Sequence, residues 1–118
     1  MNVFSEDDLE VTPEQVAQWL DDGGDGVQLV DVREPYEHEA GHIAQARHIQ
    51  LERLASQAET IDRKRRVVFQ CRIGARSAMA AQAFRAAGYE AYSMQGGLTA
   101  WAEKGLPLSP EGGRVAEH

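Results

Sequence analysis

The sequence predicts an α/β fold in which short parallel strands alternate with helices. Segments with apolar residues at helical spacing alternate along the chain with short runs of β-branched and aromatic residues, and turn-forming residues separate them. Strands that are joined by helical crossovers pair in parallel. The chain has 118 residues, of which 42% are hydrophobic and 26% charged, and it contains no repeat or dividing linker. We therefore expect one domain over residues 1–118 with a continuous core.

A first helix is expected from residue 13 to about residue 20. Thr12 can cap it, Pro13 suits its first turn and Gln15 can complete a capping box. Apolar side chains then recur at helical spacing, at Val16, Trp19 and Leu20. The run DDGG at 21–24 ends this helix.

Two units, each a short strand followed by a short helix, are expected in the middle of the chain. The apolar run at 27–32 (VQLVDV) is typical of a buried strand, and a short helix over 35–40 comes after it, closed by a glycine. Residues 46–49 predict a second short strand, and residues 51–58 predict a second short helix.

The second half of the chain carries the clearest junction between a strand and a helix. Residues 66–70 (RVVFQ) are rich in β-branched and aromatic side chains, which predicts a central strand. The alanine-rich segment at 76–87 predicts a helix that ends at a glycine. A strand over 91–94 and a last helix over 98–104 complete the pattern, and residues 111–118 are expected to be frayed.

Charge is distributed unevenly around a formal net value of −7. Residues 1–62 carry fifteen acidic and three basic side chains, whereas residues 63–118 carry nine basic and four acidic ones. Six of the twelve basic residues fall between Arg63 and Arg76 and flank the single cysteine, Cys71. The negative total argues against nucleic acid as a partner, because binding of phosphate groups needs a basic surface.

Targeting and metal-binding signals are also missing from the sequence. No apolar run approaches the roughly 18 residues that a membrane-spanning helix requires. The acidic start at 1–10 differs from the basic and then apolar start of a secretory signal, so we expect a cytoplasmic protein without a membrane partner. One cysteine cannot form an intramolecular disulfide, and the histidines lack the spacing of zinc ligands. We expect no metal and no cofactor.

Cys71 is expected to lie between the end of a strand and the start of a helix. A helix amino terminus presents unpaired N–H groups and the positive end of the helix dipole. Arg72 and Arg76 add positive charge, and Gly74 lets the backbone curl so that successive amides point inward. A lone cysteine is most often a small buried hydrophobe, but these surroundings favour the thiolate and so predict a nucleophile.

The local chemistry alone fits either a sulfur carrier or a cysteine phosphatase, since both hold an activated cysteine in an anion cradle. Tyrosine phosphatases and dual-specificity phosphatases use the spacing C-x5-R, whose arginine clasps a phosphate group. In this sequence Arg76 follows Cys71 with the spacing C-x4-R. The shorter loop makes a tighter cradle and favours a terminal sulfur atom over a tetrahedral phosphate.

Four blocks of the sequence resemble the rhodanese family, and the resemblance extends over about residues 8–108, the expected core. In chain order these blocks are DVREPYE at 31–37, GHIAQA at 41–46, CRIGARS at 71–77 and GGLTAWAEKGLPL at 96–108. The second block departs from the family pattern GHIPGA, because Ala44 and Gln45 replace the usual proline and glycine. That turn must therefore be built differently.

The resemblance implies an open parallel sheet of five strands with helices on both faces and the active loop at the end of the central strand. It also implies the activity: the Cys71 thiolate takes a sulfane sulfur from thiosulfate or another persulfide or polysulfide donor. The sulfur then passes from a persulfide to a thiol or cyanide acceptor. The loop residues implied to bind the donor are Arg72, Ile73, Gly74, Ala75, Arg76 and Ser77.

Individual roles follow from the same resemblance. Arg72 and Arg76 attract the anionic donor, and the loop amides hold the terminal sulfur as an oxyanion hole holds developing charge. Ser77 either bonds the sulfur or caps the helix, and capping is favoured. For Asp31 and Arg33 a buried ion pair or hydrogen bond that supports the loop is favoured over a catalytic role, because buried charges are usually paired.

Two other functions stay open from the sequence. The chain could be a carrier module that is loaded by one protein, such as a cysteine desulfurase, and delivers sulfur to another sulfur-relay protein. It could also be a cysteine phosphatase or arsenate reductase, which the C-x4-R spacing disfavours. The expected partners are therefore a small anionic sulfur donor and a thiol or cyanide acceptor, with a protein partner as the alternative.

Overall fold

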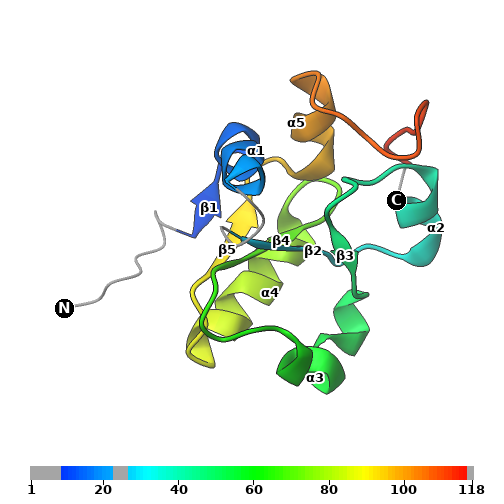
Figure 1. Cartoon of the computed structure of the whole chain (residues 1–118). Coiled ribbons are helices and arrows are strands. Elements are labelled where there is room, and N and C mark those ends of the chain that lie inside the picture. The colour runs from blue at the N-terminus through cyan, green and yellow to red at the C-terminus, as the bar shows by residue number, and fades with distance from the viewer. Residues whose placement is uncertain (1–8, 23–26, 117–118) are drawn as a thin grey trace.

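The computed structural model describes residues 9–22 and 27–116, and it has the α/β fold predicted from the sequence (Figure 1). Five parallel strands form one sheet in the order β1-β5-β4-β2-β3. The strands are β1 Glu10–Val11, β2 Gln28–Asp31, β3 Arg47–His48, β4 Val67–Gln70 and β5 Ala91–Met94. The α-helices are α1 Pro13–Asp21, α2 Pro35–Ala40, α3 Leu54–Gln57, α4 Ala75–Ala86 and α5 Gly97–Glu103. Short 3₁₀ turns, Leu51–Arg53 and Ala58–Thr60, flank α3.

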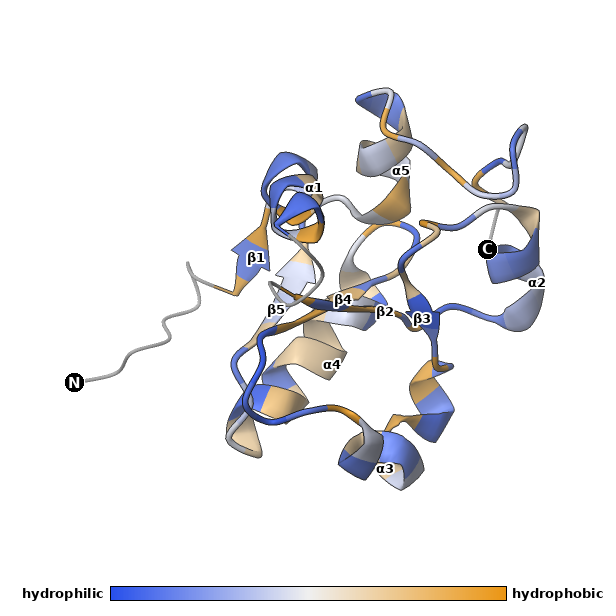
Figure 2. Ribbon diagram, viewed as in Figure 1, coloured by the Kyte–Doolittle hydropathy of each residue, from blue (hydrophilic) through white to orange (hydrophobic). Residues whose placement is uncertain are grey.

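Helices cover both faces of the sheet, with α1 and α5 on one side and α3 and α4 on the other (Figure 1). On the second side Phe69 of β4 packs against Phe84 of α4, with ring centroids 4.8 Å apart. On the first side Val68 packs in a cluster with Val16 and Trp101. All four residues of β4 are buried, which explains its continuous apolar run. In Figure 2 the apolar residues of α1 lie on the side that faces the sheet.

The structure contains a strand that the residue pattern did not predict. β1 has two residues and lies at the edge of the sheet, where Glu10 and Val11 are in register with Ser93 and Met94 of β5. Pairing with β5 fixes this strand, and two residues are too few to show an alternating pattern. The other predicted elements are present with ends shifted by a few residues. Within residues 9–22 and 27–116 no helix is long and apolar enough to cross a bilayer.

The end of the chain also differs from the frayed segment predicted over 111–118. The Arg114 N–H donates to the carbonyl of Ala40 over 2.8 Å, and Ala116 is buried. Gly41 permits this approach, because a Cβ at that position would collide with the backbone of Arg114. The described part of the tail therefore packs against the end of α2, while residues 117 and 118 lie outside the described residues.

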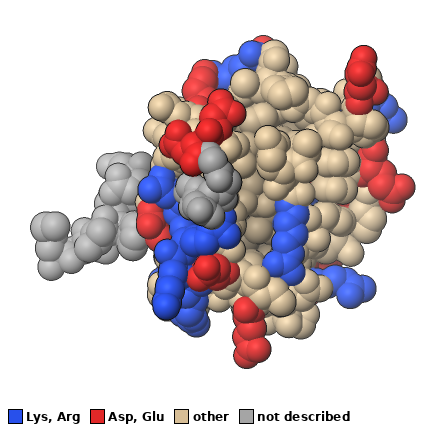
Figure 3. Space-filling view, viewed as in Figure 1, with Lys and Arg blue, Asp and Glu red and all other residues tan. Residues whose placement is uncertain are grey.

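The basic residues that flank Cys71 in the sequence are divided between the two ends of β4. Residues 63–66 precede the strand, and Figure 3 shows a cluster of basic side chains over this loop. There the guanidinium of Arg66 lies 4.3 Å from the ring centroid of Trp19. A strand of four residues spans about 13 Å, so this basic run is far from Cys71. Only Arg72 and Arg76 of the six follow the strand.

Candidate active site

Cys71 lies at the carboxyl end of the central strand, between Gln70 of β4 and the start of α4. In open parallel sheets, ligands bind at this edge. The beginning of α5 holds the loop in place: the Leu98 N–H donates to the carbonyl of Cys71 over 2.8 Å, and the Thr99 N–H donates to that of Arg72 over 3.0 Å. The junction predicted from the sequence is therefore present and is anchored by a third element.

Backbone amides converge on the sulfur atom of Cys71. The Gly74 N–H donates to Sγ over 3.1 Å, and the Ser77 N–H approaches it at 3.4 Å. Gly74 has φ 115°, a conformation that L side chains rarely adopt, so the turn at this position favours glycine. Cys71 itself is only 1% exposed. The loop thus shields the sulfur from bulk water while directing two N–H donors to it, which stabilises negative charge there.

Ser77 does not cap α4, contrary to the expectation from the sequence. The N-cap residue is Gly74, and Ser77 lies in the first turn, where its hydroxyl donates to the Gly74 carbonyl over 3.1 Å. The Ser77 Oγ also lies 3.5 Å from Cys71 Sγ and 2.7 Å from the Oγ of Ser93 in β5. Both serines are fully buried. Ser93 lies outside all four sequence blocks, so sequence reasoning missed it.

Arg76 is tied to a buried carboxylate. Its two Nη atoms donate to the Oε atoms of Glu37 over 2.8 and 3.0 Å, which links α4 to α2. Burial alone would raise the pKa of Glu37, but the hydrogen bonds from Arg76 and from the Glu34 N–H outweigh it and hold that pKa below its usual value. The Glu37 hydrogen bonds also raise the pKa of Arg76. Any contact of Arg76 with an anionic sulfur donor therefore competes with this ion pair.

The other loop residues present charge and apolar surface at the rim. Arg72 is partly exposed, and its Nε is buried and has no hydrogen-bond partner within the described part of the chain. Ile73 is 56% exposed, which places an apolar side chain at the entrance. Ala75, the first residue of α4, is exposed as well. Arg72 is thus the loop cation that is less engaged with the protein.

Asp31 and Arg33 form a fully buried ion pair beside the loop. Arg33 donates from Nε and Nη2 to the carboxylate over 2.9 and 2.7 Å, and Nη2 also reaches the Gly41 carbonyl at 2.8 Å. Burial would raise the pKa of Asp31, but the Arg33 hydrogen bonds and charge lower it. Asp31 is the register partner of Gln70, so the ion pair lies beside the strand end that leads into Cys71.

Three histidines are stacked over this ion pair. The ring centroid of His38 lies 3.9 Å from that of His42 and 4.5 Å from that of His48. The Nδ1 atom of His38 is 2.8 Å from Asp31 Oδ2. Burial lowers the pKa of His38, and the neighbouring histidines lower it further, although Asp31 opposes the shift. Among the described residues, no group of three or more His, Cys, Asp and Glu side chains could hold a metal ion.

This stack predicts a loss of stability in mild acid. A histidine whose pKa is lowered on folding is held neutral in the folded protein. Its contribution to the free energy of unfolding is complete above pH 6.5, the ordinary pKa, and is lost as the pH falls through the lower pKa of the folded protein. We expect the free energy of unfolding in urea to decrease between pH 7.5 and pH 5.5, and to decrease less in His38→Asn. Equal decreases in both proteins would contradict this account.

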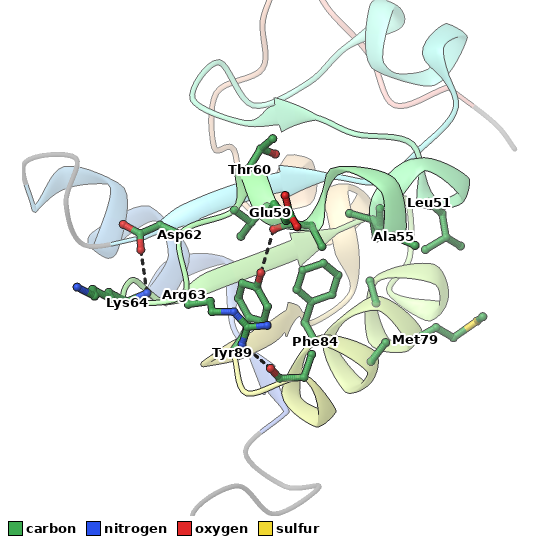
Figure 4. Close-up of a pocket in the computed structure, with 16 residues that line it drawn as sticks. Leu51, Ala55, Glu59, Thr60, Asp62, Arg63, Lys64, Met79, Phe84 and Tyr89 are labelled. Atoms are coloured by element: carbon green, nitrogen blue, oxygen red, sulfur yellow. Dashed lines mark hydrogen bonds between the residues drawn. The ribbon is translucent and has the colours of Figure 1, made fainter.

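One apolar cavity is separate from the loop. It encloses about 950 Å³ between α3 and α4, and Figure 4 shows Leu51 and Met79 at one end and Asp62 and Lys64 at the other. None of residues 71–77 lines it. Its walls are mostly alanine and other apolar side chains, and the Tyr89 hydroxyl already donates to the Ala58 carbonyl over 2.9 Å. This cavity therefore does not include the candidate loop around Cys71.

Comparisons with known proteins show the family and the fold of the chain. A family model described as a rhodanese-like domain matches residues 12–104. The chain is 38% identical over 105 residues to a sulfurtransferase of Allochromatium vinosum, covering 87% of this chain and 97% of that protein. It is 35% identical over 92 residues to the thiosulfate sulfurtransferase GlpE of Pseudomonas aeruginosa, covering 77% of this chain and 81% of that protein. A rhodanese-related protein of Thermoplasma volcanium superposes with a TM-score of 0.77 at 25% identity, over 84% of this chain and 95% of that one.

Proposed function

The chain belongs to the rhodanese-like family, and on that premise we propose that it transfers sulfane sulfur through a persulfide on Cys71. The observation that carries this proposal is the pair of backbone N–H groups, from Gly74 and Ser77, that point at Sγ. Cys71 is the only cysteine of the chain, so no second thiol can resolve a disulfide within it. Sulfur must therefore leave to an external acceptor.

The proposed reaction has two displacement steps. In the first, the Cys71 thiolate attacks the outer sulfur of thiosulfate, an Sγ–S bond forms, and sulfite leaves with the electron pair of the broken S–S bond. In the second, a thiolate or cyanide acceptor attacks the terminal sulfur, and Cys71 leaves as the thiolate. The acceptor ends as a persulfide or as thiocyanate, and the enzyme returns to its starting state.

The loop supports both steps by stabilising charge on sulfur. In the resting state the Gly74 and Ser77 amides face Sγ, and in the persulfide the curled backbone offers the same kind of donor to the terminal sulfur. Arg72 draws the anionic donor toward the loop, since it is the less engaged of the two loop arginines. Arg76 adds its charge from the ion pair with Glu37.

The thiosulfate and cyanide assay tests this function. We expect the wild-type protein to form thiocyanate from the two substrates, and Cys71→Ala to form none. The C-x4-R loop is a poor phosphatase site, because the arginine that would clasp a phosphate is already bonded to Glu37. Hydrolysis of a small aryl phosphate that depends on Cys71, without thiocyanate formation, would overturn the proposal in favour of that chemistry.

A protein sulfur donor or acceptor is the second candidate, and one observation favours it. Among the described residues the exposed large hydrophobic side chains are Tyr36, Ile73 and Met79. Ile73 belongs to the loop, Tyr36 adjoins Glu37, and Met79 lies one turn beyond Arg76 on α4. The exposed apolar side chain of Ile73 on the loop itself suits a protein surface better than it suits thiosulfate. Fast loading by a cysteine desulfurase together with negligible use of thiosulfate would favour this carrier function.

A further inference from the structure

We propose that Ser93 is a positioning residue for Cys71 and that it acts through the hydroxyl of Ser77. The inference rests on the proposed function, because it concerns how the Cys71 thiolate is stabilised. Ser93 comes from β5 and Ser77 from α4, and their Oγ atoms are 2.7 Å apart. Ser77 Oγ is in turn 3.5 Å from Cys71 Sγ. The three residues thus form a buried chain of polar groups that ends at the sulfur.

The hydrogen-bond inventory fixes the direction of the first link. Both serines are fully buried, and each hydroxyl has one proton to donate. Within the part of the chain that the structure describes, Ser77 Oγ is the hydrogen-bond partner of the Ser93 hydroxyl. A buried hydroxyl whose proton has no acceptor is energetically costly. Ser93 therefore donates its proton to Ser77.

The second link depends on the charge of Cys71. In the thiol form the Cys71 S–H donates to Ser77 Oγ, while the Ser77 hydroxyl donates to the Gly74 carbonyl at 3.1 Å. When the thiol loses its proton, Ser77 can rotate its hydroxyl from that carbonyl to the sulfur. The thiolate then has three donors: the Gly74 N–H, the Ser77 N–H and the Ser77 hydroxyl.

Ser93 strengthens this third donor without touching the sulfur. By donating to Ser77 Oγ it polarises that hydroxyl, and hydrogen bonds in such a chain reinforce one another. When Cys71 is a thiol and the Ser93 hydroxyl is removed, the Ser77 hydroxyl still accepts from the Cys71 S–H and donates to the Gly74 carbonyl. Loss of the Ser93 hydroxyl therefore disfavours the thiolate more than the thiol. This differential effect separates a positioning role from a purely structural link between β5 and α4.

Alkylation of Cys71 by iodoacetamide tests the proposal without any sulfur donor. The thiolate forms an S–C bond and iodide leaves, and Cys71 is the only cysteine, so the rate reports this residue alone. We expect Ser93→Ala to lower the alkylation rate at pH 7 by about 2- to 10-fold, the worth of one hydrogen bond. We also expect the midpoint of the pH–rate profile to move to higher pH.

A double-mutant cycle with Ser77→Ala supplies the control. If Ser93 acts through Ser77, Ser93→Ala has no further effect in the Ser77→Ala background. Ser93→Thr, which keeps the hydroxyl, should retain the wild-type profile. An unchanged profile in Ser93→Ala, or an equal shift in both backgrounds, would overturn the proposal. If the serine variants shift the alkylation profile as expected but the wild-type protein forms no persulfide, the proposed function is overturned and the role of Ser93 stands.

Discussion

The Gly97→Ala variant is expected to lose about 100-fold in kcat/KM for sulfur transfer, because displacing a reacting group by about 1 Å costs that much. Gly97 has φ +60°, and a Cβ there would lie 2.5 Å from the carbonyl oxygens of both Cys71 and Arg72. These are the oxygens that accept the N–H groups of Leu98 and Thr99. The added methyl group must therefore push the loop away from α5. Steady-state kinetics with thiosulfate and cyanide measure the loss.

Gly105→Ala is the matched control for this variant. Gly105 has φ +76°, so alanine brings a similar backbone strain, but a Cβ there meets nothing within 4 Å. We expect the control to lose about 1–2 kcal/mol of stability and to keep its kcat/KM. Similar activity losses in both variants would mean that backbone strain, and not the displaced loop, lowers the activity.

The Arg76→Met variant is expected to lose about 3 kcal/mol of free energy of unfolding at pH 7. The substitution keeps an apolar stem of similar length but leaves the fully buried carboxylate of Glu37 without its partner. Breaking such a pair costs about 3–5 kcal/mol, and the low end applies because Arg76 is itself partly exposed. Urea unfolding measures the effect.

The double variant Arg76→Met/Glu37→Gln separates the charge from the packing. Glutamine removes the buried charge and keeps an oxygen that can accept the Glu34 N–H, which donates to Glu37 Oε1 over 2.9 Å in the wild-type protein. We expect this variant to recover most of the lost stability. A double variant as unstable as Arg76→Met would show that packing of the arginine stem, and not charge pairing, holds α2 to α4.

The sequence was sufficient to place Cys71 because local signals coincide there. The β-branched run of β4 and the alanine-rich α4 are strongly patterned, and a glycine and two arginines lie between them. The alternation of strands and helices then determines the α/β class, and crossover geometry makes the sheet parallel. These features depend on residues that are close together in the sequence, so the sequence alone predicts them.

The features that the sequence missed depend on residues far apart in the chain. Arg76 and Glu37 are separated by 39 positions, and their ion pair links α4 to α2, which no local pattern in the sequence indicates. Ser93 reaches the site only because β5 lies beside β4. β1 likewise exists through its pairing with β5. Tertiary contacts, and not local propensity, decide each of these cases.

Intact-mass spectrometry after incubation with thiosulfate tests the central claim most directly. The proposed chemistry predicts that the reduced protein gains the mass of one sulfur atom, that dithiothreitol removes it, and that Cys71→Ala never acquires it. A fully reduced wild-type protein that gains no sulfur from thiosulfate, polysulfide or a loaded cysteine desulfurase would contradict the persulfide on Cys71. So would an equal gain of mass in the Cys71→Ala variant.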